Sequence, residues 1–230
     1  MPDAKDDNAV SAEELDLKQV RAGIDTLDLV ILNAIKDRAD LAAQVSKAKG
    51  GRHTFRPGRE ADLIRNLVRQ SSLPASLVEH IWRVIIAHNL ASQAELNIAV
   101  HDDVDTVAAA QFRFGRNVAA TLTADSSDVI ASVAARTAHL GVIPHWQDDA
   151  DWLSALASHR AAGDDVYIAA YTHMHDDHKL RQCVVIASVL PDASSADQTL
   201  IMGDDNLSLR DGHHPDALGL LGIVQICDIS

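Results

Sequence analysis

One long amphipathic stretch near the N-terminus constrains the fold of this chain more than any other feature. From Ala12 to Lys49 the residues favour helix and include no proline, and apolar side chains recur every three or four positions until Gly50 and Gly51 end the pattern. A helix of roughly 38 residues is about 57 Å long, which exceeds the diameter of a domain of about 100 residues. We therefore expect a second copy of the chain to cover the overhanging apolar stripe, which consists of Leu17, Val20, Ile24, Leu27, Ile31, Ile35, Leu41 and Val45.

Two shorter helical patterns follow, and after them the composition changes. Pro57 suits the first turn of a helix that ends near Ser71, and a third pattern begins at Pro74 and runs to about Ile98. Residues 1–100 carry 13 Lys and Arg against 14 Asp and Glu, whereas the remaining residues carry 7 against 19. This break predicts two domains, an all-helical one at residues 1–99 and an acidic one at residues 100–230.

The second part of the chain has the pattern of a mixed α/β domain, because apolar runs rich in β-branched residues alternate with short helical patterns. The expected strands lie at residues 118–123, 140–143, 166–171, 184–189 and 222–226, and the expected helices lie at residues 104–116, 128–138 and 151–160. The predicted fold class is therefore α + α/β, with three helices in the first part and a smaller mixed domain after them.

Composition argues against several classes of protein. The 20 Lys and Arg against 33 Asp and Glu give a formal net charge of −13, which disfavours nucleic acid or an anionic membrane as the main partner. The 2 cysteines cannot build a disulfide framework, and no apolar run approaches the roughly 20 residues of a membrane helix. The first residues are acidic where a secretory signal would be basic and then apolar, so we expect a cytoplasmic protein.

The helical part carries cations and amides at spacings that suit an anionic ligand, and it offers no plausible nucleophile. Arg38 and Lys49 are 11 residues apart, which at about 100° per residue places both on one helix face. Arg21 lies 17 residues before Arg38, about 25 Å away, so it can join the same pocket only from a partner subunit. Asn89 and Gln93 are four residues apart on the third helical pattern and face the same way.

Three segments of this part resemble the helical chorismate mutases of the AroQ class. They are VRAGIDTLDLVILNAIKDRADLAAQVSKAK at residues 20–49, RPGRE at residues 56–60 and IWRVIIAHNLASQAEL at residues 81–96. The resemblance implies a homodimer of helical subunits that converts chorismate to prephenate, a step of the shikimate pathway to phenylalanine and tyrosine. It also implies that no metal and no cofactor take part, because one C–O bond breaks as one C–C bond forms within a single molecule.

The resemblance assigns a role to each catalytic residue. Arg38 and the Arg21 of a second copy would hold the two carboxylates of chorismate, and Lys49 would contact a carboxylate and the ether oxygen. Gln93 would complete the ether site, and Glu60 would take the ring hydroxyl. Arginine suits the carboxylates because its planar fork binds them bidentately, and one preorganised donor at a developing negative charge typically contributes about 3 to 4 kcal/mol.

Three further positions are expected to contact substrate. Arg59 would frame the pocket, while Arg56 and Asn89 stand where some members of the family have an acidic residue and a serine. Neither departure removes a charge that the mechanism needs. Nothing in the pattern selects the remaining arginines of the last two helical segments, which we expect to be surface or salt-bridge residues: Arg52, Arg65, Arg69 and Arg83.

Two alternatives remain open for the helical part. The isochorismate-pyruvate lyases of salicylate pathways resemble these mutases and use much the same cationic pocket, and helices that only dimerise would give a non-catalytic, regulatory protein. In the second part, residues 121–144 with AAAQFRFG before them resemble part of a prephenate dehydratase lobe. The Gly-rich opening and the Thr-Arg-Phe motif of that family are absent, so we expect a degenerate lobe without dehydratase activity.

A histidine-rich cluster follows one of the expected strands. His173, His175, Asp177 and His178 resemble the HxHxDH pattern of metallo-β-lactamase-type hydrolases, in which imidazoles and a carboxylate converge on zinc. The glycines that usually follow are replaced by Lys-Leu-Arg at residues 179–181, and few residues remain for the other ligands. We interpret the cluster as a polar loop and predict no metal site.

Overall fold

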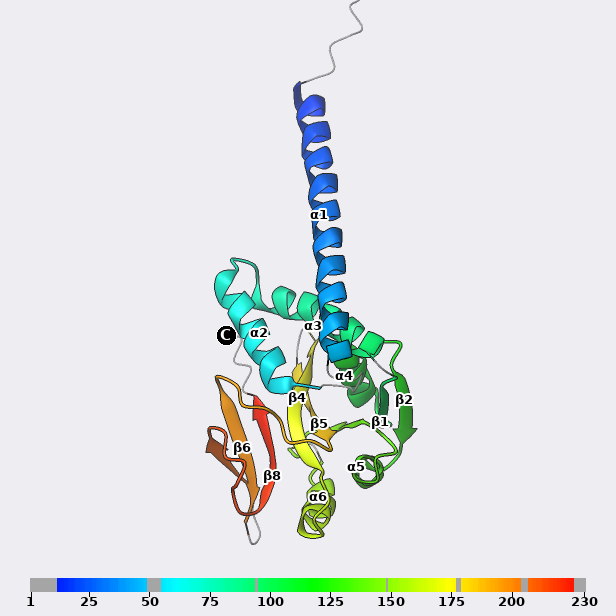
Figure 1. Cartoon of the computed structure of the whole chain (residues 1–230), viewed down its shortest axis with the longest axis vertical. Helices are drawn as coiled ribbons and strands as arrows, with labels where there is room; N and C mark the ends of the chain where they lie inside the picture. Colours follow the sequence, from blue (N-terminus) through cyan, green and yellow to red (C-terminus); the bar gives the residue numbers. More distant parts are fainter. Residues whose placement is uncertain are drawn as a thin grey trace, which may run out of the picture.

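Three helices form the first part of the chain. The computed structural model describes residues 12–48, 55–93, 95–147, 149–176, 179–203 and 207–225, and the helices are α1 (Ala12–Ala48), α2 (Pro57–Gln70) and α3 (Ala75–Gln93). Figure 1 shows α1 as a long rod that projects from the body of the molecule, with α2 and α3 near its base. The expected all-helical first part is confirmed. The third helix is shorter than expected, because Ile98 belongs to a strand.

The rest of the chain folds into a mixed sheet with helices, which confirms the predicted fold class of α + α/β. The sheet has eight strands in the order β2-β1-β3-β5-β4-β8-β6-β7. β1 pairs in parallel with β2 and β3, and β4 pairs in parallel with β8, whereas the other neighbours are antiparallel. The elements are β1 (Asn97–His101), α4 (Val104–Phe114), β2 (Ala119–Thr123), α5 (Ser126–Ala134), β3 (Leu140–Pro144), α6 (Trp152–Ala161), β4 (Tyr167–Asp176), β5 (Lys179–Ala187), β6 (Asp197–Met202), β7 (Leu207–Asp211) and β8 (Leu220–Gln225).

Three strands were not expected from the sequence, namely β1, β6 and β7. β1 spans the position at residues 99 and 100 where the composition changes, so the first strand of the sheet begins before the expected domain boundary. Its five residues directly follow a helical pattern, and their apolar spacing continues that pattern without a break. Local sequence therefore gives little sign of the change from helix to strand.

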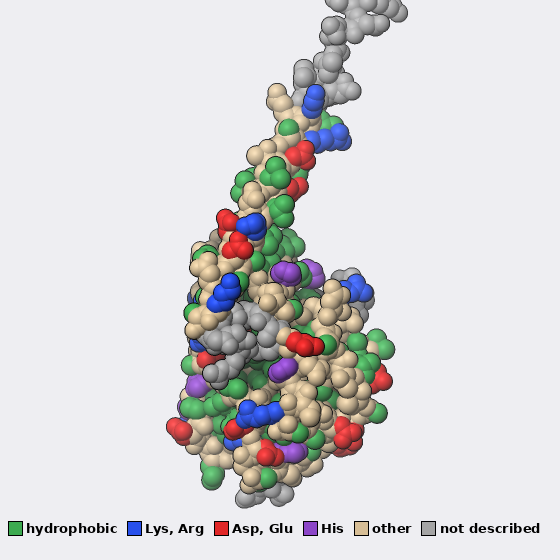
Figure 2. All heavy atoms as spheres, turned by 45° about the vertical axis from the view of Figure 1, so that its right-hand side comes forward, with side chains coloured by type: hydrophobic (Ala, Val, Ile, Leu, Met, Phe, Trp, Pro, Cys, Tyr) green, Lys and Arg blue, Asp and Glu red, His purple; other side chains and the backbone are tan. Residues whose placement is uncertain are grey.

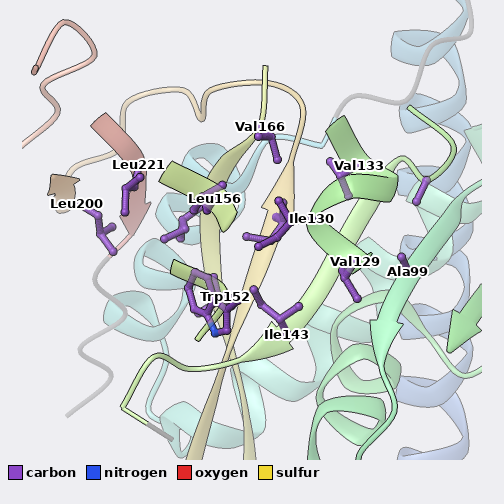
Figure 3. Close-up of a cluster of buried hydrophobic side chains, with 14 of the residues drawn as sticks. Ala99, Val129, Ile130, Val133, Ile143, Trp152, Leu156, Val166, Leu200 and Leu221 are labelled. Carbon is purple, nitrogen blue, oxygen red and sulfur yellow. The ribbon is translucent and has the colours of Figure 1, made fainter. Parts of the chain in front are cut away.

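Helices cover both faces of the sheet because successive residues of a strand point to opposite sides. On one face, Ala99 of β1 joins a buried cluster with α5 and α6, which Figure 3 shows around Ile130, Trp152 and Leu156. On the other face, Ile98 joins a second cluster with α4 and with Leu90 of α3. The helical part and the sheet therefore share one hydrophobic core on the second face.

The described part of α1 buries few of its apolar residues within the chain. Leu27 is 62% exposed, Ile31 is 55% exposed and Ile24 is 53% exposed, and Figure 2 shows apolar side chains along the projecting rod. Only toward its C-terminal end does α1 pack against α3. None of the helices in the described ranges combines the length and the apolar character that a membrane crossing requires.

Candidate active site

Arg38 lies in the C-terminal third of α1, and α1 packs against α3. Its side chain is half-buried, and its Nη1 atom is buried without a hydrogen-bond partner among the described residues. Burial lowers the pKa of the Arg38 guanidinium, because desolvation disfavours its charged form. A buried donor without an acceptor costs free energy, so this position suits an anionic group supplied by a ligand.

Asn89 on α3 provides a second donor of the same kind. The residue is 6% exposed, and its Nδ2 atom has no hydrogen-bond partner within the described part of the chain. Gln93 lies one turn later at the end of α3, but its side chain lies outside the described residues. The two helices α1 and α3, which pack together, therefore each carry one buried polar nitrogen without an acceptor in the described part of the chain.

Glu60 lies in the first turn of α2 and is held by two arginines. Its Oε2 atom accepts a hydrogen bond from Nη2 of Arg113 at 3.0 Å and from Nη1 of Arg83 at 3.3 Å. Arg83 also contacts Glu79, with 3.5 Å between Nε and Oε1. Arg83 and Arg113 are each 5% exposed and Glu79 is 1% exposed, so three members of this four-residue ion-pair cluster are buried, and Glu60 is partly buried.

Arg113 reaches this cluster from α4, which belongs to the α/β part. Its guanidinium carbon lies 5.4 Å from the ring centre of Phe55 and 6.0 Å from that of Phe114. The sequence pattern selected neither Arg113 nor Arg83. The available signals were the two phenylalanines that flank Arg113 in the chain and the four-residue spacing between Glu79 and Arg83, both of which also occur on solvated helices.

The start of α2 is fixed to the loop between β5 and β6. Arg56 forms an ion pair with Asp192 at 2.9 Å, and the expected substrate contact of Arg56 stays a prediction. A Cβ atom on Gly58 would lie 2.3 Å from the carbonyl oxygen of Asp192, so only glycine permits this approach. Asp62 accepts hydrogen bonds from the backbone and the hydroxyl of Ser195 at 3.0 and 2.6 Å. Arg59, in contrast, is exposed.

Arg21 is not brought to the other predicted site residues within one chain. It is exposed on the projecting part of the same continuous helix that carries Arg38. Lys49 lies outside the described residues. Among the expected catalytic residues, the structure thus describes the side chains of Arg21 and Arg38 on α1 and that of Glu60 on α2.

The histidine-rich cluster was expected to be a polar loop, but His173 and His175 lie in β4, where they pair in register with Gln182 and Leu180 of β5, so this part of the cluster is strand. The side chains of His173 and His175 and the whole of Asp177 and His178 lie outside the described residues. Within the described ranges, no group of three or more histidine, cysteine, aspartate or glutamate side chains is arranged to hold a metal ion.

Comparison with known proteins identifies the helical part. Residues 20–94 match the family of type II chorismate mutases, which confirms the resemblance seen in the sequence. The matched range contains all the expected site residues from Arg21 to Gln93.

Several bifunctional chorismate mutase/prephenate dehydratases are similar to this chain. The protein from Pseudomonas aeruginosa is 32% identical over 144 residues, which are 58% of this chain and 40% of that protein. The protein from Stutzerimonas stutzeri is 30% identical over 139 residues, 56% of this chain and 38% of that protein. The protein from Aquifex aeolicus is 29% identical over 140 residues, again 56% and 38%. The chain therefore spans about two fifths of the length of these relatives.

The similarity to these relatives extends into the α/β part. Since 58% of 230 residues is about 133, at least about 39 matched residues lie beyond residue 94. This agrees with the weak resemblance to a dehydratase lobe noted from the sequence. A solved structure described as "GqqA- a novel type of quorum quenching acylases" is 13% identical, with a TM-score of 0.39, over 58% of this chain and 96% of that chain. Similarity at this level supports no inference about activity.

Proposed function

We propose that this chain, whose residues 20–94 match the type II chorismate mutases, converts chorismate to prephenate as a homodimer in the biosynthesis of phenylalanine and tyrosine. The observation that carries the proposal is a pair of buried donors on two helices that pack together, Arg38 Nη1 on α1 and Asn89 Nδ2 on α3, which have no acceptors among the described residues. Chorismate is a dianion with an ether oxygen and a ring hydroxyl, so it can satisfy such donors.

The reaction is an intramolecular rearrangement, so the pocket needs to hold one conformer and to stabilise developing charge. Arg38 would bind one carboxylate through its planar guanidinium, and this contact would help to hold the compact conformer in which the reacting carbons meet. Lys49 and Gln93 would donate to the ether oxygen, where negative charge accumulates as the C–O bond breaks. Donors aimed at that oxygen bind the transition state more tightly than the ground state, and this difference accelerates the reaction.

Glu60 would accept a hydrogen bond from the ring hydroxyl. Both of its arginine partners contact Oε2, and neither of these ion pairs uses Oε1. A carboxylate held in this way can accept a further hydrogen bond through Oε1 while the two arginines balance its charge.

The exposed stripe of α1 supports the homodimer. A second copy that packs against this stripe would bury residues such as Leu27 and Ile31, and each fully buried side chain of this kind contributes about 1.5 to 3 kcal/mol. The same arrangement would allow the Arg21 of one copy to reach the pocket of the other.

Product identification tests the proposal directly. The purified chain is incubated separately with chorismate and with isochorismate, and the products are separated and identified by mass spectrometry. Prephenate from chorismate supports the mutase, whereas salicylate and pyruvate from isochorismate without prephenate from chorismate would assign the chain to the lyases. If neither chorismate nor isochorismate is consumed, the result supports the non-catalytic alternative.

A second incubation with prephenate tests the α/β part. We expect no phenylpyruvate, because the Gly-rich opening and the Thr-Arg-Phe motif of the dehydratases are absent. Phenylpyruvate formation at a rate comparable with mutase turnover would show that this part is a working dehydratase.

A further inference from the structure

We propose that Arg113 is a positioning residue for Glu60, so that the α/β part completes the active site of the helical part. This inference rests on the proposed mutase function. It assigns a task to the part of the chain that carries no expected mutase residue, since Arg113 belongs to α4 and Glu60 to α2, 53 residues earlier in the chain.

The geometry around Glu60 supports a positioning role more than a surface ion pair. The side chain of Arg113 is 4% exposed and that of Glu60 is 14% exposed, so solvent screens their interaction weakly. Phe55 and Phe114 both lie within cation–π range of the guanidinium. Arg113 therefore has little freedom to turn away, and the carboxylate of Glu60 is held at a defined place.

A second set of contacts fixes α2 from another side. Arg56 pairs with Asp192, Asp62 accepts hydrogen bonds from Ser195, and Arg65 donates to Ser194 at 3.0 Å. All three partners lie in the loop that connects β5 to β6. The helix that carries Glu60 is thus held by α4 through Arg113 and by this loop, and both belong to the α/β part.

The energetic importance of this arrangement follows from the demands of the reaction. A pericyclic rearrangement offers no covalent step through which the enzyme could act, so its rate depends on how closely the pocket fits the reacting conformer. A displacement of about 1 Å of a positioning group can cost about 10²-fold in rate. Loss of Arg113 would leave the Glu60 carboxylate with Arg83 alone and free to shift.

A double-mutant cycle in the full chain tests the inference. We measure kcat/KM with chorismate for the wild type, Arg113→Met, Glu60→Gln and the double variant. If Arg113 acts through Glu60, Arg113→Met lowers kcat/KM by about 10²-fold in the wild-type background but by less than about twofold once Glu60 is Gln. Arg113→Lys keeps the charge, and we expect it to recover at least about tenfold of the loss.

Controls separate positioning from a general effect on the fold. Arg136→Met removes an exposed ion pair with Asp165 in the α/β part and is expected to leave kcat/KM unchanged. All variants are assayed at a temperature at which circular dichroism shows each of them to be folded, and Arg113→Gln replaces Arg113→Met if the latter is not folded there.

Three outcomes would overturn the positioning role while mutase turnover by the wild type stands. They are an equal loss of kcat/KM in both backgrounds, no loss of kcat/KM in the wild-type background, and an Arg113→Lys variant that is no more active than Arg113→Met. A wild-type chain without mutase turnover would instead overturn the proposed function, and the inference with it.

Discussion

The projecting part of α1 and the junction between α2, α3 and α4 both depart from the usual distribution of side chains, in which apolar residues are buried and charged residues are exposed. Along α1, large apolar residues such as Leu27 and Leu32 are each 62% exposed. At the junction, Glu79, Arg83 and Arg113 are nearly inaccessible to solvent. Exposed apolar side chains in a continuous stripe indicate a surface that a partner covers, whereas buried charges persist only where they are paired.

The difference shows which part of the molecule is complete within one chain. The charges at the junction have found partners across two parts of the same chain, with Arg113 of α4 bound to Glu60 of α2. The apolar stripe of α1, in contrast, is largely exposed and is not covered by other described residues of the chain. We therefore expect changes in the stripe to act on assembly, and changes at the junction to act on the single subunit.

The largest expected effect comes from charge in the stripe. The double variant Ile24→Asp, Ile31→Asp would place carboxylates in the apolar dimer interface, so we expect monomers and a loss of mutase activity on the order of 10³-fold or more. Light scattering measures the oligomeric state, and a chorismate assay measures the activity. In an isolated subunit these positions are exposed, so the change should alter the free energy of unfolding by no more than about 0.5 kcal/mol. An unchanged oligomeric state would contradict the dimer. Leu218→Asp, at a leucine that is 95% exposed outside α1, is the matched control.

The next largest effect is expected at Arg38, which is half-buried in the C-terminal third of α1. Arg38→Ala removes the proposed carboxylate contact, and we expect kcat/KM to fall by about 10²-fold to 10³-fold with the dimer intact. Steady-state kinetics and light scattering check the two expectations. Arg69→Ala, at an exposed arginine on α2, should behave as the wild type. Equal activity of the two variants would remove Arg38 from the site.

At the junction we expect an effect on stability. Arg83→Met removes the buried ion pair between Arg83 and Glu79, so the free energy of unfolding should fall by about 3 kcal/mol. This value is near the low end for a broken buried pair, because Glu60 keeps its ion pair with Arg113. Urea denaturation followed by circular dichroism measures the change at constant protein concentration. A change below about 0.5 kcal/mol would show that this pair behaves as a surface pair.

A smaller, pH-dependent effect is expected at Asp62, on the side of α2 that faces the loop between β5 and β6. Partial burial raises the pKa of Asp62, but the hydrogen bonds from Arg65 and Ser195 outweigh it and leave the pKa below its ordinary value of 3.8. The carboxylate therefore stabilises the fold above that ordinary value and loses this contribution as the pH falls through the lower pKa of the folded state. Because Asp62 is partly exposed, the contribution should stay below about 1 kcal/mol.

The comparison of Asp62→Asn with the wild type checks this expectation. We expect a lower melting temperature of the variant at pH near 7 and a gap that narrows as the pH falls below 3.8, because the carboxyl group of the unfolded wild-type chain takes up a proton before that of the folded chain. A gap that stays constant over this range would show that the charge of Asp62 does not stabilise the fold.

The smallest expected effect is that of metal removal. The rearrangement needs no metal ion, so treatment with EDTA followed by gel filtration should leave kcat/KM within about twofold of the untreated enzyme. Metal analysis of protein without a histidine tag is the accompanying measurement. Loss of mutase activity that zinc restores would contradict the prediction that the cluster from His173 to His178 holds no metal ion.

Much of the fold could be predicted because helix length and period leave a strong pattern in the sequence. The limits of α1 and α2 follow from Gly50 and Pro57 and from regular apolar spacing. β1 was missed because its five residues continue a helical spacing, and only pairing with β2 and β3 makes them a strand. β6 and β7 are short, and β6 pairs with β7 on one side and with β8 on the other, which the local sequence does not encode.

The sequence by itself determined the long amphipathic helix, the α + α/β class and the likeness of residues 20–94 to the chorismate mutases, because these depend on local period and on residue types at fixed spacing. Only the tertiary structure decided that Arg113 meets Glu60 and that Asp192 meets Arg56. Each of these pairs joins elements far apart in the chain, and a charged residue carries no local mark of whether the fold will bury it.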